Sequence, residues 1–270
     1  MKLGGTLSRV LIGGALALAV FLLVMRAPGW SLAVLVAAWS VLATLEFIRL
    51  LRPAGIELNP WLLGLLNAST VAAAWLGWLP GYLAAPFAVV LVLSVLLADP
   101  RPRTPVYSVF ILVYTGFLPA HLVLVRETVG AQGLSPWLVM FPLLATWLND
   151  TAAWGAGRLF GRTKLMPALS PKKTWEGFLA GLVVSAAFAA LFLSRFSPFA
   201  DRPWQFLAVV GIGLGTLSQV GDLFESIFKR AVAVKDSSTA LGEHGGFLDR
   251  VDSLLFTIPA WYWLLRVYLP

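Results

Sequence analysis

The chain has 270 residues, of which 59% are hydrophobic and only 12% are charged. A mean hydropathy of +0.83 excludes an ordinary soluble domain, and the lack of cysteine excludes disulfide bonds and thiolate metal sites. The formal net charge of +7 fits basic loops at a membrane and a site for anions. No Lys/Arg-rich tail or basic soluble domain indicates binding to nucleic acid.

The apolar runs are long and continuous, which predicts membrane-spanning helices rather than the strands of a barrel. The first run follows two basic residues but has no signal-peptide cleavage site after it, so we interpret it as a retained helix. The fold class is therefore all-α and polytopic. Breaks at proline, glycine and charged residues give about nine spans: 7–25, 30–51, 60–79, 82–98, 106–125, 136–158, 175–194, 204–228 and 251–268.

We expect one membrane-embedded unit (1–270), in which residues 1–135 form mainly scaffold and lipid-facing helices and residues 136–270 carry the polar motifs. With nine spans, 15 of the 20 Lys and Arg residues lie on the side of the N-terminus and five on the other. This bias predicts a cytoplasmic N-terminus. Eleven of the 13 acidic residues fall on or near the same side, which ordinary solvated loops do not explain. A polar site facing the cytoplasm is therefore expected.

The first polar cluster is Asn149-Asp150, about fourteen residues into a span. A carboxylate at membrane depth is expected to be paired or functional. The structural alternative is an ion pair with Lys or Arg of another helix. Glycines at 155, 157 and 161 would permit close helix packing or a helix end near phosphate.

The second cluster is Ser170-Pro171-Lys172-Lys173, followed by Thr174-Trp175-Glu176-Gly177. Proline is tolerated in the first turn of a helix, so Ser170 is predicted to be an N-cap. A helix N-terminus with free N–H groups and two lysines would suit a phosphate. A simple basic cytoplasmic loop is the alternative.

The third cluster spans the end of one helix, a loop and the start of the last helix. Asp222, Glu225/Ser226 and Lys229 share one helix face by their spacing. Asp249 and Asp252 are three residues apart and are predicted to share a face at the start of the last helix. Such an oxygen-rich set suits Mg²⁺ with substrate phosphates, whereas a network of salt bridges is the alternative.

Two glycine-containing stretches near this cluster carry different predictions. The loop His244-Gly245-Gly246 could bring backbone N–H groups close to a ligand. His244 alone is more typical of a structural residue, since no zinc motif is present. Gly211, Gly213 and Gly215 lie in an apolar run and indicate helix packing rather than nucleotide binding.

The polar positions of the third cluster resemble the signature of phosphatidate cytidylyltransferases (CDP-diacylglycerol synthases) over 27 residues. The first and second clusters resemble upstream motifs of that family, in the expected order. Departures are Gly242-Glu243, where Pro-Gly is commoner, and Trp154, where Tyr or Phe is more usual. The matching positions are Ser226-x-Phe228-Lys229-Arg230, Lys235-Asp236, and Leu241-Gly242-x-His244-Gly245-Gly246-Phe247-x-Asp249-Arg250-Val251-Asp252.

The resemblance implies transfer of CMP from CTP to phosphatidic acid, giving CDP-diacylglycerol and pyrophosphate, with Mg²⁺ as cofactor. It also implies a homodimer in the cell (cytoplasmic) membrane, multi-pass, with the active site facing the cytoplasm and membrane lipids around it. It points to Asp222 and Asp249 as the principal metal ligands and leaves room for a second, monovalent cation such as K⁺.

We divide the remaining roles by chemistry, with Asp150 and Asp252 as auxiliary metal ligands. The lipid phosphate is already an anionic nucleophile, so catalysis reduces to positioning two polyanions and neutralising their charge. The predicted catalytic residues are Asp222, Asp249, Lys229 and Ser226. The predicted substrate-binding residues are Lys172, Lys173, Arg230, Lys235, His244, Arg250 and Asn149.

Other functions remain open from the sequence. The nearest is a cytidylyltransferase or kinase acting on another membrane lipid, since no residue in the apolar helices indicates which lipid tails the protein binds. A cation-coupled anion transporter is a different class. It would predict discontinuous helices at the midplane and an internal repeat, whereas here the charge gathers at one face. A structural scaffold would leave the intramembrane carboxylates without a purpose.

Overall fold

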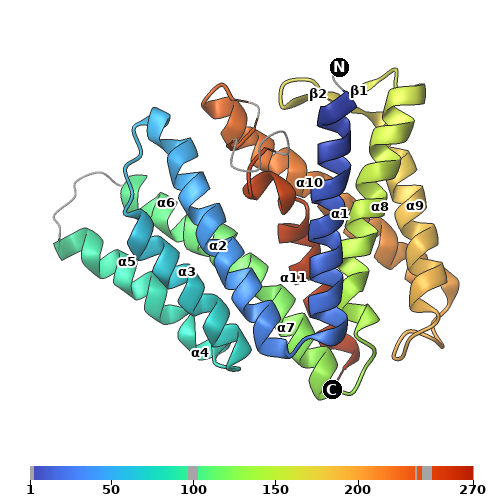
Figure 1. Cartoon of the computed structure of the whole chain (residues 1–270), viewed down its shortest axis with the longest axis horizontal. Helices are drawn as coiled ribbons and strands as arrows, with labels where there is room; N and C mark the ends of the chain where they lie inside the picture. Colours follow the sequence, from blue (N-terminus) through green and yellow to red (C-terminus); the bar gives the residue numbers. More distant parts are fainter. Residues whose placement is uncertain (1–2, 97–102, 235, 239–244, 270) are drawn as a thin grey trace. The chain divides into compact units, whose positions relative to one another are not determined.

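The computed structural model describes residues 3–96, 103–234, 236–238 and 245–269, and these are almost entirely helical (Figure 1). The predicted all-α class is confirmed. The chain forms two compact units, described separately below. Unit 1 comprises Met1–Glu127 and Ala231–Arg250, and unit 2 comprises Thr128–Arg230 and Val251–Pro270.

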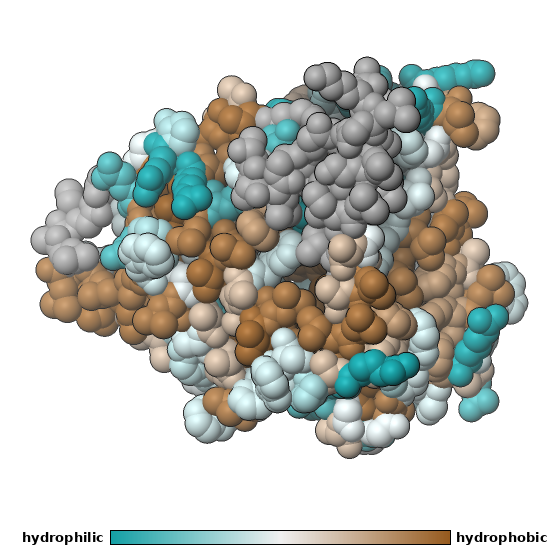
Figure 2. All heavy atoms as spheres, in the orientation of Figure 1, coloured by the Kyte–Doolittle hydropathy of each residue, from teal (hydrophilic) through white to brown (hydrophobic). Residues whose placement is uncertain are grey.

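Apolar helices long enough to cross a membrane account for much of the described chain. Large hydrophobic side chains are exposed on these helices, and hydrophobic residues cover much of the face seen in Figure 2. Contact with lipid explains such exposure, which a soluble monomer would avoid. Within the described residues, four stretches meet the length and hydropathy of a span: Gly29–Ala54, Arg103–Ala131, Trp175–Leu193 and Trp204–Ala231.

Unit 1 is built around α2 and α3, which pack against each other and against a π-helical turn, η2. Asn59 caps α3, because its side chain accepts hydrogen bonds from the N–H groups of Trp61 (3.1 Å) and Leu62 (3.0 Å). In chain order the elements are α1 (Leu3–Arg26), α2 (Gly29–Leu51), η1 (Arg52–Ala54), α3 (Pro60–Trp75), α4 (Leu79–Tyr82), α5 (Ala84–Leu96), α6 (Arg103–Ile111), η2 (Leu112–Phe117), most of α7 (Leu118–Ala131) and η4 (Leu248–Arg250).

A buried polar cluster joins α2, α3 and η2. The Asn67 side-chain amide donates to Thr44 Oγ1 (2.8 Å) and Thr115 Oγ1 (3.0 Å), and these two hydroxyls are 2.8 Å apart. Ser40 Oγ donates to the carbonyl of Thr115. Asn67 also lies against Gly116, where no side chain would fit. Polar groups inside hydrocarbon need partners, and this cluster supplies them to the Asn67 amide nitrogen and to the two threonine hydroxyls.

Unit 2 contains a pair of closely packed helices, α8 and α9, which lie side by side in Figure 1. A two-stranded antiparallel hairpin joins them, with Lys164 opposite Thr174 and Met166 opposite Ser170. The Trp261 indole on α11 donates to the Leu138 carbonyl on α8 (2.8 Å). The elements are α8 (Trp137–Phe160), β1 (Lys164–Met166), β2 (Ser170–Thr174), α9 (Trp175–Leu193), α10 (Trp204–Ala231) and α11 (Leu254–Tyr268).

Two of the three glycines predicted to support helix packing do so. A Cβ at Gly211 would strike the backbone carbonyl of Ser185 and lie 2.8 Å from Ala189 Cβ, and one at Gly215 would lie 2.7 Å from Asn149 Nδ2. Gly213 has no neighbour within 4 Å of such an atom. Small residues at 211 and 215 therefore let α10 approach α8 and α9 closely.

Two predicted helix starts are wrong. Ser170 is not an N-cap, because residues 170–174 pair as a strand and α9 begins at Trp175, with the Thr174 hydroxyl accepting from the Gly177 N–H (3.2 Å). The last helix begins at Leu254 rather than 251. Asp249 therefore lies in the 3₁₀ turn η4 and Asp252 in the turn before α11, not together on a helix face.

Candidate active site

Asn149 links three helices of unit 2. It is fully buried on α8. Its Nδ2 donates to Ser185 Oγ on α9 (2.9 Å), and its Oδ1 accepts from Gln219 Nε2 on α10 (2.8 Å). Both the nitrogen and the oxygen of the Asn149 amide are thus hydrogen-bonded to neighbouring helices. This residue, which was predicted to bind substrate, therefore holds α9 and α10 against α8.

The same connections continue to two predicted site residues. Gln219 Oε1 accepts from Lys173 Nζ (3.1 Å), and Lys173 Nζ also pairs with Asp222 Oδ2 (3.0 Å). We call the series Ser185, Asn149, Gln219, Lys173 and Asp222 the polar chain of unit 2. It fixes a lysine of the hairpin against α10. The last two members of the series, Lys173 and Asp222, are partly exposed, so their charges are available to a ligand.

Three carboxylates of unit 2 gather near this end. Asp222 interacts electrostatically with both Asp150 and Asp252. Asp150 Oδ1 accepts from Ser218 Oγ (3.2 Å). The backbone of Asp252 lies against Gly221, whose missing side chain permits the approach. The first and third predicted motifs thus meet in unit 2.

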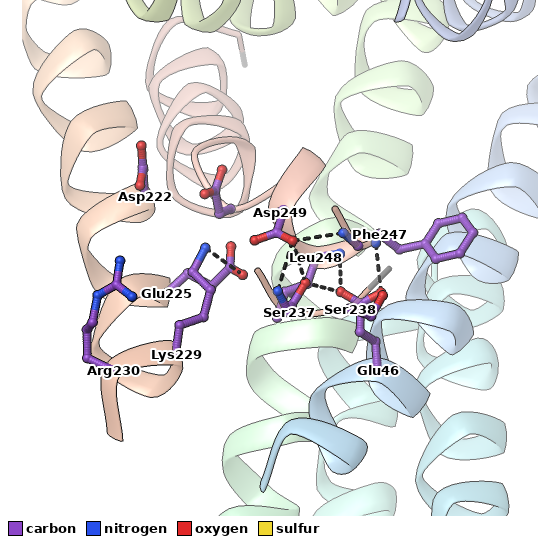
Figure 3. A network of polar contacts seen from close by, with 12 residues as sticks. Glu46, Asp222, Glu225, Lys229, Arg230, Ser237, Ser238, Phe247, Leu248 and Asp249 are labelled. Carbon is purple, nitrogen blue, oxygen red and sulfur yellow. Dashed lines mark hydrogen bonds and ion pairs between the residues drawn. The ribbon is translucent and has the colours of Figure 1, made fainter. Parts of the chain in front are cut away.

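Basic groups offset this negative charge. The ammonium group of Lys173 attracts the carboxylate of Asp150, and the ammonium group of Lys229 attracts the carboxylate of Asp252. Lys229 Nζ, which is nearly buried, also forms an ion pair with Glu225 (3.2 Å), one turn earlier on α10 (Figure 3). Three aspartates therefore face two lysines, and one of these lysines is shared with a buried glutamate.

Arg230 and the hairpin are connected directly. Arg230 Nε donates to the Leu169 carbonyl in the hairpin turn (3.0 Å). Lys172, on the same hairpin, is exposed, and Ser226 is buried on α10. The hairpin therefore presents one lysine to solvent and holds the other in the polar chain.

In unit 1, Asp249 accepts three hydrogen bonds at one oxygen. Asp249 Oδ2 lies 3.0 Å from the Ser237 N, 2.7 Å from Ser237 Oγ and 2.8 Å from the Gly246 N. Figure 3 shows this network together with Glu46 of α2. The arrangement orients the carboxylate of Asp249 through two residues that precede it in the chain, Ser237 and Gly246.

Several polar residues of the site were not singled out from the sequence. Gln219, Ser185 and Ser218 are uncharged single polar residues within apolar helices and belong to no charged cluster. Glu46 did leave a signal, because it is a carboxylate inside the apolar run 30–51, where acidic residues are rare.

The predicted site residues are divided between the two units. Asp222 belongs to unit 2 and Asp249 to unit 1. Arg250 is exposed at the end of η4. Lys235 and His244 lie outside the described residues. Among the residues described, no group of three or more His, Cys, Asp or Glu side chains is arranged to hold a metal ion.

The donor chemistry of unit 2 nevertheless fits magnesium. Asp150, Asp222 and Asp252 offer hard carboxylate oxygens, the ligand type that Mg²⁺ prefers together with phosphates. In the structure, Asp222 forms an ion pair with Lys173. The site is thus a set of carboxylates and ammonium groups close to one another.

The sequence model of the "Cytidylyltransferase family" matches residues 7–268. The chain belongs to the cytidylyltransferase family. The match spans both units and nearly all of the helices described above.

Individual relatives of the family agree. A phosphatidate cytidylyltransferase of Bacillus subtilis is 31% identical over 273 residues, covering 96% of this chain and 97% of that protein. One of Aquifex aeolicus is 36% identical over 160 residues, or 58% and 56% of the two chains. One of Staphylococcus saprophyticus is 46% identical over 121 residues, or 45% and 46%. The matched region thus spans about half of the last two relatives and nearly all of the first.

Proposed function

We propose that this cytidylyltransferase transfers CMP from CTP to phosphatidic acid, giving CDP-diacylglycerol and pyrophosphate for phospholipid synthesis. The observation that carries the proposal is the match to a Bacillus phosphatidate cytidylyltransferase along 96% of the chain. The gathering of carboxylates and lysines in unit 2 supports it, because both substrates are polyanions.

The reaction needs no activated side-chain nucleophile. An oxygen of the lipid phosphate attacks the α-phosphorus of CTP and forms a new P–O bond. The bond between the α-phosphorus and its bridging oxygen breaks, and pyrophosphate leaves with the electron pair. The protein contributes by holding the two phosphates in line and by stabilising negative charge as it moves.

The basic residues would hold the phosphates and stabilise their negative charge. Lys173 is held against Asp222 by Gln219, so its ammonium group can turn to a phosphate oxygen without leaving the site. Lys172 and Arg230 would bind further phosphate oxygens, and Lys229 would act with them. Arg230 is already oriented by the Leu169 carbonyl, which reduces the entropy lost on binding.

Magnesium is the proposed cofactor, with Asp222, Asp249, Asp150 and Asp252 as its ligands. When bound, it would neutralise the charge of the triphosphate oxygens. A second, monovalent cation such as K⁺ is proposed beside it. The excess of carboxylates over lysines near Asp222 supports a need for cations.

We further propose a setting for the reaction. The enzyme would act as a homodimer in the cell (cytoplasmic) membrane, with about nine spans, a cytoplasmic N-terminus and the site facing the cytoplasm. The distribution of Lys and Arg between the two sides supports this orientation, and it would give the site access to CTP.

The test uses the purified protein in detergent with CTP, phosphatidic acid and Mg²⁺, and measures pyrophosphate and CDP-lipid. Wild type is expected to form both in equal amounts. Asp222→Asn is expected to lose about a hundredfold or more in rate, as when a charge-stabilising group is removed. Asp201→Asn changes an exposed aspartate outside the site and serves as the control. A wild type that forms no CDP-lipid would contradict the proposal.

The same assay separates the competing lipid substrates. Another lipid phosphate that is used faster than phosphatidic acid would assign the other substrate. A kinase would instead release CDP from CTP and phosphorylate a lipid alcohol. A transporter would consume no CTP.

A further inference from the structure

A buried carboxylate on α2 binds the segment that leads into η4. Glu46 is only 4% exposed. Its Oε2 accepts from Ser238 Oγ (2.9 Å) and from the Phe247 N–H (2.8 Å). Its Oε1 accepts from the Leu248 N–H (3.1 Å) and lies within hydrogen-bonding distance of Ser237 Oγ. One side chain thus holds two short stretches of chain at once (Figure 3).

The two stretches are those that orient Asp249. Ser237 donates its N–H to Asp249 Oδ2, and its hydroxyl lies between that oxygen and Glu46. A hydroxyl has one proton, so it donates to one carboxylate at a time. The Gly246 N–H, next to the Phe247 N–H that Glu46 binds, is another donor to Asp249.

A second residue of α2 supports the same segment. The indole of Trp39 donates to the Phe247 carbonyl (3.1 Å), and its ring meets the Phe247 ring edge-on at 5.2 Å. Trp39 and Glu46 are seven residues apart and share one face of α2. Phe247 is therefore held at its N–H by Glu46 and at its carbonyl by Trp39.

The arrangement requires a carboxylate at position 46. Three donors converge on it, and the Ser237 hydroxyl can donate either to it or to Asp249. A carboxylate has about four acceptor positions and no donor. A glutamine would offer one oxygen, and its NH₂ group would face backbone N–H groups. Hydrogen bonds to a charged acceptor are also about twice as strong as neutral ones.

We propose that Glu46 is a positioning residue that fixes Asp249 through Ser237 and the backbone N–H groups of residues 246–248. Its two carboxylate oxygens are buried and bound by groups of the protein itself. Its effect on activity rests on the proposed function, since Asp249 matters to the rate only if it serves the CMP transfer. Its effect on local structure does not depend on that function.

The first experiment measures hydrogen–deuterium exchange of peptides covering 245–253 in the purified full chain. In Glu46→Gln, only one acceptor oxygen remains for the N–H groups of Phe247 and Leu248. At least one of these two N–H groups is therefore expected to exchange about tenfold faster or more. Glu57→Gln makes the same chemical change at an exposed position just beyond α2 and is expected to leave exchange unchanged. Unchanged protection in Glu46→Gln would overturn the proposal.

Conservative variants keep the test decisive if Glu46→Gln does not fold. Glu46→Asp retains the charge but is one methylene shorter, so it should recover part of the protection. Ser237→Ala removes only the hydroxyl between the two carboxylates and should leave the exchange of Phe247 and Leu248 near wild type. Equal exchange in Glu46→Asp and wild type would show that the reach of the side chain is irrelevant and would also count against the proposal.

The second experiment measures the Mg²⁺ dependence of CDP-lipid formation. Glu46→Gln is expected to raise the Mg²⁺ concentration for half-maximal activity about ten- to a hundredfold, as when a supporting residue of a metal ligand is lost. The effects of Glu46→Gln and Ser237→Ala should be less than additive, because both act through Asp249. An active Glu46→Gln with the Mg²⁺ dependence of wild type would refute the positioning role. An inactive wild type would instead refute the proposed function. The hydrogen–deuterium exchange experiment would still test whether Glu46 fixes the backbone of residues 246–248.

Discussion

Replacing Gly211 by alanine should destabilise unit 2, whereas the same change at Gly213 should not. Both glycines lie on α10, two residues apart. At Gly211 the new methyl group would meet the Ser185 carbonyl and lie 2.8 Å from Ala189 Cβ, whereas at Gly213 nothing lies within 4 Å. A backbone carbonyl inside α9 cannot turn aside as a flexible side chain can. Gly211→Ala therefore has to push the two helices apart.

The pair of variants isolates the packing contribution. Overpacking of this kind costs about 1–3 kcal/mol. Alanine also favours a helix over glycine by about 1 kcal/mol, and this gain is common to both positions. Gly213→Ala should then be slightly more stable than wild type, and the two variants should differ by about 1–3 kcal/mol in the free energy of unfolding.

Thermal unfolding in detergent, followed by tryptophan fluorescence, measures this difference. For chains of similar size, each kcal/mol moves the Tm by about 2–4 °C. The residual rate of CDP-lipid formation after heating gives a second reading, because separation of α10 from α9 also disturbs Asn149, which is hydrogen-bonded to both helices. Equal Tm values for the two variants would refute the close approach of α9 and α10.

Three further outcomes follow from the contacts of unit 2. Gln219→Leu should lower the rate of CDP-lipid formation about ten- to a hundredfold. Lys173 loses an acceptor, and the buried side-chain oxygen of Asn149 loses its donor, which costs about 1–3 kcal/mol. An unchanged rate at saturating CTP would contradict this. Thr174→Ala removes the cap of α9 and should lower the free energy of unfolding by about 1 kcal/mol in thermal denaturation, while Thr174→Ser retains it. Lys172→Ala should raise the KM for CTP more than Lys172→Arg, if this exposed lysine binds phosphate as a point charge; equal KM values would argue against that role.

The helices could be predicted from the sequence because hydropathy is a local property. The run 30–51 corresponds to α2 at Gly29–Leu51, and the run 204–228 to α10 at Trp204–Ala231. The hairpin could not be predicted in this way. Its strands have three and five residues, and they form because they pair with each other rather than because of their own propensity.

The candidate site was predictable where it carries charge in an apolar setting. Asp150 and Asp222 stood out for that reason, and the structure brings them close to each other. Gln219 was not predictable, because a single amide in the middle of a helix does not indicate a site until its partners are known. Glu46 has partners 191 to 202 residues away in the chain, and no local pattern reports pairing over such a distance.

The buried cluster around Asn67 has a consequence for movement in the membrane. Thr44 belongs to this cluster and lies two residues before Glu46 on α2. Sliding α2 by one residue, or turning it, would break its hydrogen bonds with α3 and η2 together, and hydrocarbon offers no replacements. The three elements are therefore locked in register and can move only as a rigid block. Glu46 belongs to the same helix, so its carboxylate cannot shift along the helix axis independently of this block. The segment that bears Asp249 is therefore hydrogen-bonded to a rigid part of the protein.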